Sequence, residues 1–554
     1  MSSNETQTAV TRRKPDAEEA GLDDHDSLST IRHADDVLLA KLGYRSEFKR
    51  QISLIESTAI VLSILAPLES VTVTLPFPLA SGGHVGMVFG WIIPCMLTMS
   101  VAACMAELTS AMPTSGGLYY FSARLAPRRW APLACWITGW ANVTGQIALM
   151  CSSDYLTAQM IVTALNAGSD GAIKLGLGPT YGIMLALLVS HGIVCSFKTG
   201  ILARLNVYYV ILNLVTLIAL SVALLVCSGD QRVSAKTAFT KFDNNTGWSN
   251  NGWAFLLAFY APMWTMVGYD SAAHLSEETT GAARVAPIAI VGAVASTSIL
   301  GWLLYISISF ATASVPHLLA TDFTIPAGQL YIDVLGKPGM LVVWSILIFV
   351  GYACGAAQGV DASRVIFAFS RDNALPGSKW WKRVHPRTRT PIHAVWLVMV
   401  LAAILGLLSF SDNALTSLAG ASVIALYTSY ITPIILRLTS GRRTFEPGPF
   451  SLGKWHMPVG IVAVTWTAFL IVLFVFPSGP HPTAETMNYT VVVIMAVFTF
   501  ASLSWIFSAR TWFKGPVRTI GQGEEAHEDS EKLDEKDQTS VHEREVLSRM
   551  MLSA

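Results

Sequence analysis

Long apolar segments alternate with short polar segments along most of the chain. A transmembrane helix needs roughly 20 apolar residues, and about twelve segments meet this requirement. We predict these spans at residues 54–80, 85–108, 130–160, 179–197, 204–227, 253–276, 285–314, 339–369, 391–410, 413–437, 457–476 and 488–508. An alternative with ten or eleven spans and one re-entrant segment fits the same pattern. The fold class predicted is an all-α polytopic membrane protein.

The composition separates this chain from soluble proteins. Hydrophobic residues form 52% of the sequence and charged residues only 13%. A soluble domain carries about 25% charged residues, because its surface must be hydrated. We therefore expect the lipid bilayer to surround most of the chain. The 37 basic residues are balanced by 37 acidic residues, so no basic excess indicates a nucleic-acid partner.

The two ends of the chain differ from its middle. Residues 1–45 and 515–554 are rich in charged residues, serine and threonine and poor in aromatic residues. Such segments cannot bury enough apolar surface to offset their chain entropy. We predict two disordered cytoplasmic tails around a transmembrane domain at 46–514. The first 50 residues lack an apolar core, so we expect the first span to act as the insertion signal in place of a cleaved peptide.

The distribution of lysine and arginine predicts the orientation, because short loops rich in these residues stay in the cytoplasm. Basic clusters on one side include residues 32–50, 124–129, 364–389, 437–443 and 510–518. Both termini are therefore predicted to be cytoplasmic. We expect the plasma membrane, with the vacuolar membrane as the alternative, and predict no particular oligomeric state. On the opposite side, Asn244 and Asn488 begin N-x-T tripeptides, which are candidate glycosylation sites.

Two of the predicted spans are interrupted at corresponding positions. Pro67 and Glu69 fall about a dozen residues into the first span, and Pro262, Gly268 and Asp270 fall at a similar offset in the sixth. Two sets of five spans that begin in this way have inverted topology, and two broken helices then meet at a midplane binding site. The alternative is that both prolines cause ordinary kinks.

Asp270 is the most informative single residue, because a carboxylate deep in an apolar helix is costly and usually functional. We predict that Asp270 takes part in proton coupling, together with Glu69. The alternative places Asp270 near the cytoplasmic interface as a local cap. Trp264 lies roughly 16 Å into the same span, too deep for an interfacial aromatic belt. We predict that it contacts the substrate, while helix packing is the competing interpretation.

Further polar residues are candidates for binding or gating. Asn142, Gln146 and Gln358 lie within predicted spans and could hydrogen-bond a substrate or join helices. Glu277 and Glu278 follow the sixth span; we predict that they pair with Arg284 or the basic 364–389 segment and hold an inner gate, unless they form a solvated helix end. The seven cysteines lack metal-ligand spacing. We predict no metal and no cofactor.

Four motifs in the same order resemble a known family. They are ELTSAMPTSGGLYY at 107–120, CWITGWANVTGQI at 135–147, GYDSAAHLSEE at 268–278 and FAFSRDNALP at 367–376. This chain resembles the fungal amino acid, GABA and choline permeases of the amino acid, polyamine and organocation superfamily over most of residues 45–510. The resemblance implies inverted five-helix repeats with broken helices one and six plus two extra helices, and secondary transport by alternating access.

The resemblance also suggests a binding site. In relatives similar to the bacterial arginine and agmatine antiporter, a tryptophan in a W-x-x-[VI]-G context stacks on the substrate. The matching residues here are Trp264, Val267 and Gly268, with Tyr269 beside them. The first broken helix departs from its relatives, which have glycines there. The residues at this break are Pro67, Leu68, Glu69, Ser70 and Val71.

The charge of Glu69 would repel a substrate carboxylate and attract an amine, which favours choline or a polyamine over an ordinary α-amino acid. No Walker A motif, zinc-protease motif or nucleophile elbow occurs in the sequence. The prediction is a secondary active transporter, not an enzyme, of a small amine or amino acid (choline, GABA, polyamine or amino acid), coupled to protons. The alternative is a non-transporting nutrient sensor or a membrane-embedded enzyme on the same scaffold.

Overall fold

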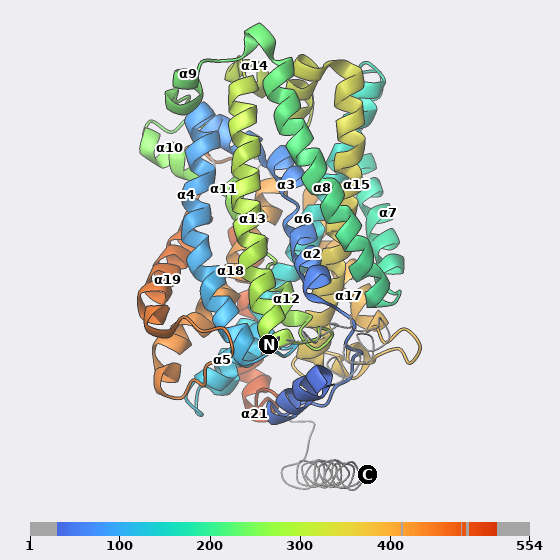
Figure 1. The fold of residues 1–554 in the computed structure, drawn as a ribbon, viewed down its shortest axis with the longest axis vertical. Helices are drawn as coiled ribbons and strands as arrows, with labels where there is room; N and C mark the ends of the chain where they lie inside the picture. The colour runs from blue at the N-terminus through green and yellow to red at the C-terminus, as the bar shows by residue number, and fades with distance from the viewer. Residues whose placement is uncertain (1–29, 411–413, 478, 484–486, 518–554) are drawn as a thin grey trace, which may run out of the picture.

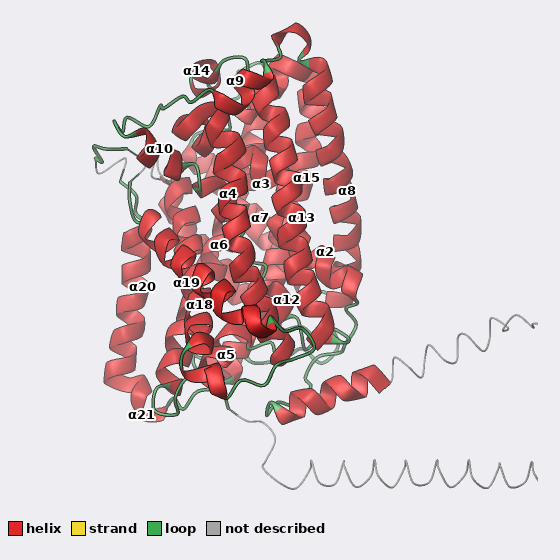
Figure 2. Cartoon of the chain, turned by 60° about the vertical axis from the view of Figure 1, so that its left-hand side comes forward, coloured by secondary structure: helices red, strands yellow, loops and turns green. Residues whose placement is uncertain are grey.

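The regular elements of the described chain are helices, apart from one isolated bridge between Ile52 and Thr279. The computed structural model describes residues 30–410, 414–477, 479–483 and 487–517. Long helices run side by side along one direction, and both ends of the described chain lie at the same end of this bundle (Figure 1, Figure 2). We call this end the chain-end face. The predicted all-α polytopic fold is confirmed.

The long helices are α2 (Leu54–Leu65), α4 (Pro76–Ala111), α6 (Ala131–Gly168), α7 (Leu177–Cys195), α8 (Thr199–Cys227), α13 (Ala282–Ala311), α15 (Ala327–Arg371), α17 (Ile392–Leu405), α18 (Ala414–Leu438), α19 (His456–Leu473) and α20 (Thr490–Ser504). The shorter helices are α3 (Pro67–Thr74), α5 (Gly117–Leu125), α9 (Ala235–Thr240), α10 (Asn251–Leu257), α11 (Tyr260–Thr265), α12 (Ser271–His274), α14 (Val315–Leu319), α16 (Ser378–Trp381) and α21 (Arg510–Trp512).

Ten helical segments of the described residues are long and apolar enough to cross a membrane. α6 and the interrupted series α10, α11 and α12 also extend along the bundle (Figure 1). α6 corresponds to the span predicted at 130–160, and the α10 to α12 series corresponds to the span predicted at 253–276. Their positions follow the predicted spans, because the apolar length required by a bilayer sets the length of each helix.

The helix boundaries differ from the predicted spans where the backbone bends. The segment predicted at 54–80 is divided at Ala66, and the chain turns again at Gly83, which has a φ of 55°. α15 begins at Ala327, twelve residues before the predicted start at residue 339, and bends at Gly336, with a φ of 71°. Glycine tolerates these positive φ angles, so long helical segments continue past sharp changes of direction.

Part of the predicted N-terminal tail is ordered. Residues 30–41 form a helix, and Leu39 and Tyr44 are buried. Asp35 accepts a hydrogen bond from the backbone N–H of Gly281 at 2.7 Å. At the other end, the N–H of Val517 donates to Asp372. The boundaries predicted at residues 45 and 515 therefore fall inside packed chain. Residues 1–29 and 518–554, the remainder of both predicted tails, lie outside the described residues.

α4 and α13 pack closely because a glycine faces a tryptophan. Trp91 of α4 is fully buried, and its indole N–H donates to the carbonyl of Ser298 on α13 at 2.9 Å. A Cβ atom added at Gly301 would overlap the Trp91 ring, whereas one added at Gly292 on the same helix would meet no atom within 4 Å. Small residues let membrane helices approach in this way.

We predict that Gly301→Ala destabilises the protein and that Gly292→Ala does not. Alanine is a better helix former than glycine, but overpacking at Gly301 should cost about 1–3 kcal/mol. The measurement is the thermal unfolding midpoint of each variant in detergent. Equal midpoints for the two variants would contradict the proposed packing of α4 on α13.

Candidate functional site

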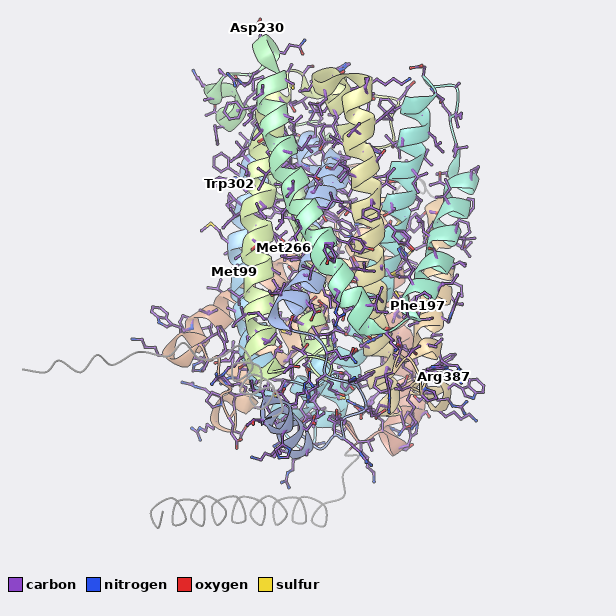
Figure 3. The ribbon with its side chains drawn as sticks, turned by 45° about the vertical axis from the view of Figure 1, so that its right-hand side comes forward. Met99, Phe197, Asp230, Met266, Trp302 and Arg387 are labelled. Carbon is purple, nitrogen blue, oxygen red and sulfur yellow. The ribbon has the colours of Figure 1, made fainter. Side chains whose placement is uncertain are left out.

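Two helix interruptions lie near the middle of the bundle. α2 ends at Leu65 and α3 begins at Pro67, with Ala66 between them in a left-handed conformation (φ 35°, ψ 63°). α11 ends at Thr265 and α12 begins at Ser271. Figure 3 shows Met266, in the second interruption, at mid-height between Asp230 at one end and Arg387 at the other. Both interruptions are thus placed where backbone groups have no water to bind.

The two interruptions touch. Gly268 has a φ of 86°, and a Cβ atom built on it would lie 2.6 Å from Cγ2 of Ile64 on α2. The same atom would lie 3.4 Å from the side-chain oxygen of Gln358 on α15. Glycine is required at position 268 for two reasons, because its φ angle is positive and because a Cβ atom would overlap Ile64.

Side chains satisfy several backbone groups at the breaks. The thiol of Cys354 donates to the carbonyl of Ile64, and the hydroxyl of Ser70 donates to the carbonyl of Leu65 at 2.8 Å. The hydroxyl of Tyr427 donates to the carbonyl of Met266 at 3.0 Å. Buried backbone groups need such partners. Ser70, predicted to contact substrate, is therefore engaged within the break itself.

Glu69 is buried in the first turn of α3, with an exposed fraction of 1%. Within the described chain, its Oε2 atom has no hydrogen-bond partner. A Cβ atom built on Gly351 of α15 would contact Cγ of Glu69 and Oγ1 of Thr157 on α6, so this carboxyl group faces α15 and α6. An unpaired buried carboxyl oxygen is costly, which makes Glu69 a candidate partner for an amine.

Asp270 lies at the centre of a second polar cluster. Its Oδ1 accepts a hydrogen bond from the hydroxyl of Tyr430 at 2.7 Å, and its Oδ2 accepts one from the amide of Asn142 at 3.0 Å. The amide of Gln146 lies 3.5 Å from the same Oδ2. The backbone N–H of Gly268 donates to the hydroxyl oxygen of Tyr430 at 3.2 Å. Tyr430 thus joins Asp270 to the interrupted backbone.

The imidazole of His274 lies between Asp270 and the carbonyl of Ser115. Its Nδ1 lies 3.1 Å from the carbonyl oxygen of Ser115, and its Nε2 lies 3.1 Å from Oδ2 of Asp270. A carbonyl only accepts, so Nδ1 must carry a hydrogen. The atoms Nε2 and Oδ2 can then share a second proton, on either the histidine or the carboxyl group. Loss of that proton would leave two lone pairs facing each other.

Two further polar residues complete this cluster. Gln358 donates from its amide to the side-chain oxygen of Gln146. Asp361, one turn further along α15, is fully buried, and both of its carboxyl oxygens lack a hydrogen-bond partner among the described residues. Asp361 interacts electrostatically with His274. The polar cluster therefore contains two carboxyl groups and one imidazole, which come from α12 with its N-cap residue and from α15.

The aromatic candidates lie before and within the second interruption. Trp264 on α11 has an exposed fraction of 4%, and its indole N–H donates to the hydroxyl of Ser152 on α6 at 3.1 Å. Tyr269 packs its ring against Tyr430, with centroids 5.1 Å apart. The remaining candidates near the breaks, Pro67, Leu68, Val71 and Val267, are buried.

Two buried ion pairs join α15 to Glu277 and Glu278 beyond this cluster. Arg371 makes two hydrogen bonds of 3.0 Å to Glu277. Arg364 donates to Glu278 at 2.8 Å. The partners therefore come from α15, within the basic 364–389 segment, and not from Arg284. The backbone N–H of Ser115 also donates to Glu277 at 2.9 Å, which links the ion pair to the turn that His274 contacts.

Asp372 ties both ends of the described chain to this closure. Its carboxyl group accepts hydrogen bonds from the hydroxyls of Tyr44 and Tyr119 and from the N–H of Val517. Burial raises the pKa of Asp372, and the neighbouring Arg371 acts in the opposite direction. Every residue from 270 to 279 is buried. The chain-end side of the site is thus packed shut.

The two predicted glycosylation positions differ in accessibility. Asn488 has an exposed fraction of 4%, and its amide donates to the hydroxyl of Tyr260 and to the carbonyls of Phe474 and Phe476. The fold does not present this amide for modification, so we do not propose Asn488 as a glycosylation site. Asn244 is half-buried in a loop at the opposite end from the chain termini, and its amide donates to the carbonyl of Trp248.

Sequence reasoning missed several members of the site. His274 stands four residues after Asp270, the spacing at which helical side chains meet. Asp361 is a second acid within an apolar span, and such acids are functional candidates by themselves. Tyr430 and Ser152 are ordinary polar residues in the sequence. They join the site through contacts between α18, α6 and the broken helices, and no local pattern marks them.

The sequence of this chain is similar to those of known proteins. The family model described as amino acid permease matches residues 52–498. The amino-acid permease BAT1 of Arabidopsis thaliana is 36% identical over 516 residues, which cover 90% of this chain and 99% of that protein. The GABA-specific permease of Saccharomyces cerevisiae is 34% identical over 494 residues, which cover 88% of this chain and 86% of that protein.

We predict that Glu277→Gln and Arg371→Gln each lower the thermal stability strongly, because each leaves a buried charge without its partner, at a cost of about 3–5 kcal/mol. The double variant should be less destabilised than the sum of the two. The unfolding midpoints of the four proteins measure this coupling. Arg284→Gln, which removes an exposed charge, is the control. Additive effects would show that the pair does not act as a unit.

Proposed function

The chain belongs to the amino acid permease family, and on that premise we propose that it is a secondary transporter. Its substrate is a small molecule with an amino group, such as an amino acid or GABA, and it works by alternating access. The observation that carries this proposal is the contact between the two interrupted helices at Gly268 and Ile64. Broken helices that meet near the midplane expose helix ends to a bound substrate.

The substrate site we propose lies between the first turn of α3 and the segment 266–270. The first turn of a helix leaves amide groups without intrahelical partners, and Glu69 adds a carboxyl oxygen that has no hydrogen-bond partner among the described residues. Trp264 supplies an aromatic face, which attracts ammonium groups. The geometry supports Glu69 as the group that receives the substrate amine.

We assign a different role to Asn142 and Gln146. Both point their amides at Oδ2 of Asp270, and Gln358 is bonded to Gln146. Their amide N–H donors are used inside the polar cluster. They therefore serve as positioning residues for Asp270, and their effect on the substrate is indirect.

Proton coupling is assigned to the pair formed by Asp270 and His274. The shared proton between Oδ2 and Nε2 can be lost to a water-filled path when the transporter opens. Its loss would weaken the contact of His274 with Ser115, and Ser115 also donates to Glu277. Glu277 and Glu278, with Arg371 and Arg364, form the inner gate in this proposal. The proton and the gate are thus connected through one turn of the chain.

The proposed orientation rests on the distribution of basic residues. We assign the chain-end face to the cytoplasm because its loops carry many lysine and arginine residues. The plasma membrane is the proposed location. Uptake would then proceed from the opposite face towards the face that the ion pairs of Glu277 and Glu278 keep closed.

The substrate class can be tested with an uptake panel and one substitution. Proteoliposomes or cells with and without the protein are given labelled alanine, GABA, choline and putrescine, at two pH values and with sodium replaced. We expect uptake of amino-bearing substrates that rises with external acidity and does not need sodium. Glu69→Gln keeps the shape but removes the charge, so it should lower the affinity for amine substrates about tenfold or more, since losing a desolvated partner costs above 1.4 kcal/mol.

Asp154→Asn is the matched control for this substitution. Asp154 is a buried acid that pairs with His191 at 3.1 Å, on helices outside the two interruptions. It should alter stability without changing the ranking of substrates. An affinity that stays within about twofold of the wild type for every amine substrate in the Glu69 variant would remove Glu69 from the binding site, and no uptake of any substrate by the wild type would refute the transport proposal.

We predict that Asp270→Asn makes residual uptake insensitive to external pH. Asparagine resembles the protonated acid in shape but cannot release the shared proton. Initial rates are measured from pH 5 to 8 and normalised to the amount of protein in the membrane. Tyr430→Phe removes one hydrogen bond to Asp270 and should shift the pH profile without flattening it. Parallel profiles for wild type and the asparagine variant would rule out coupling through Asp270.

A further inference from the structure

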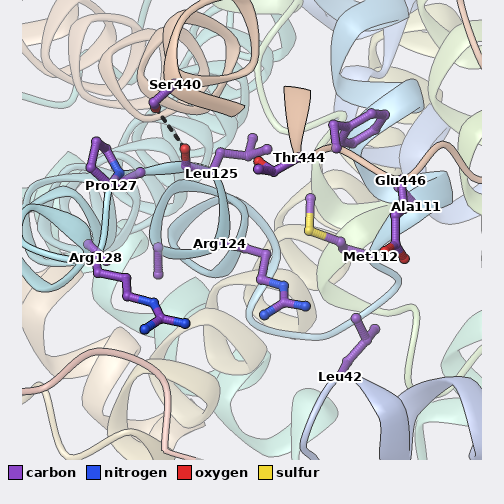
Figure 4. Close-up of a pocket in the computed structure, with 14 residues that line it drawn as sticks. Leu42, Ala111, Met112, Arg124, Leu125, Pro127, Arg128, Ser440, Thr444 and Glu446 are labelled. Atoms are coloured by element: carbon purple, nitrogen blue, oxygen red, sulfur yellow. Dashed lines mark hydrogen bonds between the residues drawn. The ribbon is translucent and has the colours of Figure 1, made fainter. Parts of the chain in front are cut away.

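A cavity of about 570 Å³ opens on the chain-end face, away from the helix interruptions. It lies between the end of α5, the turn that leads to α6 and the segment that follows α18. Figure 4 shows Arg124 and Arg128 in its lining, with Leu42, Met112 and Leu125 around them. This volume is within the range of sites that bind small molecules, about 300–1,000 Å³.

A second cavity of about 170 Å³ adjoins the first. The two share the lining residues Leu42, Ala123, Arg124 and Ala131. The second cavity adds Lys41 from the N-terminal segment and Lys514 from the C-terminal segment. We call the two together the basic cavity. Segments from both ends of the described chain therefore build its wall.

The cations of the basic cavity differ from the ion-paired arginines on this face. Arg124, Arg128, Lys41 and Lys514 are exposed, and none makes an ion pair with another described residue. By contrast, the buried Arg50, Arg364 and Arg371 pair with Asp36, Glu278 and Glu277, and the half-buried Arg437 pairs with Glu107. Glu446 is the one acid among the described residues that line either cavity. An excess of unpaired positive charge thus surrounds a concave space, which suits an anion.

The position of the basic cavity points to the membrane surface. Trp130, next to the lining residue Ala131, is 53% exposed, and Trp512, two residues before Lys514, is 47% exposed. Exposed tryptophans mark the level of the lipid headgroups. The lining also contains the apolar side chains of Leu42, Met112 and Phe445. A ligand with a charged head and an apolar body matches this mixture better than a free anion does.

We propose that the basic cavity binds the phosphorylated headgroup of an anionic lipid from the leaflet on the chain-end side. Arg124 and Arg128 extend in the same direction (Figure 4), so both guanidinium groups can donate to one phosphate group. Lys41 and Lys514 add point charges from the two terminal segments. Basic pockets of this kind, on the cytoplasmic side of membrane helices, suit phosphoinositide headgroups.

This proposal goes beyond the transport function, and only its choice of leaflet rests on the orientation proposed above. Its test measures binding, so a failure here says nothing against transport, and a failure of transport would leave it standing. Occupancy would connect the N-terminal segment, α5 and the C-terminal segment, which also meet at Asp372. The lipid would thereby stabilise the closure of the chain-end face.

The test uses the full chain purified in detergent. Binding of dioctanoyl phosphatidylinositol 4,5-bisphosphate is compared with that of dioctanoyl phosphatidylcholine and of free inositol 1,4,5-trisphosphate, by native mass spectrometry and calorimetry. We expect one saturable site for the anionic lipid and much weaker binding of the zwitterionic lipid. The double variant Arg124→Gln with Arg128→Gln should weaken the anionic lipid about tenfold or more, from the loss of two charges near the headgroup.

The matched control is Arg383→Gln with Arg387→Gln, which removes two exposed charges from the same face outside the basic cavity. Its affinity should stay within about twofold of the wild type. An equal loss of lipid affinity in both double variants would show that general surface charge causes the binding, and it would overturn the proposed site. Free inositol trisphosphate that binds as tightly as the lipid would overturn the lipid as the ligand and assign a soluble phosphate in its place.

The acidic C-terminal sequence EEAHEDSEK, at 524–532, is the alternative occupant. A chain truncated after Val517 tests it directly. An unchanged lipid affinity supports the lipid as the occupant of the intact protein. A gain of about tenfold on truncation would show that the tail fills the basic cavity, and the proposal would then fail for the full chain.

Discussion

A backbone that leaves the helix inside a bilayer must find partners for its amides and carbonyls within the protein. This constraint organises the centre of the molecule. Cys354, Ser70 and Tyr427 donate to carbonyls at the two breaks, and Tyr430 accepts from the amide of Gly268. These side chains come from α15, α3 and α18. The breaks therefore fix how the surrounding helices pack.

The hydrogen bonds in this region leave a few buried carboxyl oxygens without partners. Glu69 and Asp361 keep carboxyl oxygens without hydrogen-bond partners in the described chain, whereas Asp270 is fully surrounded by donors. α6 and α15 run past both groups and separate them, since Thr157 and Gly351 adjoin Glu69 while Asn142 and Asp361 adjoin the Asp270 cluster. In the proposed function, Glu69 belongs to the substrate site and the Asp270 cluster to a separate proton site, and both long helices contact both sites. The turn at Ser115 then connects the proton site to the ion pair of Glu277.

Much of this architecture could be predicted from the sequence, because bilayer thickness fixes the length of apolar segments and a buried acid or proline is visible in them. The spans, the breaks at Pro67 and Gly268 and the burial of Asp270 were predicted in this way. The residues that contact these groups could not be predicted from the sequence. Tyr430 lies 160 residues from Asp270, and the pairing of Gln146 with Gln358 depends on how α6 meets α15. Glu277 and Glu278 were correctly placed near basic residues, but only the fold decides that Arg371 and Arg364 are closer than Arg284.

The ordered segment at 30–45 was also missed, because its polar composition resembles a disordered tail while a few buried residues, such as Leu39 and Tyr44, anchor it.

The proposed transport function depends on a substrate site formed by the two helix interruptions. The most direct measurement is a cryo-electron microscopy map of the full chain with the best substrate of the uptake panel, compared with a map without it. We expect new density for the substrate between the first turn of α3 and residues 266–270, with the amino group of the substrate next to Glu69 and its body against Trp264. Density elsewhere, for example in the basic cavity beside Arg124, with the interruptions unchanged, would contradict it.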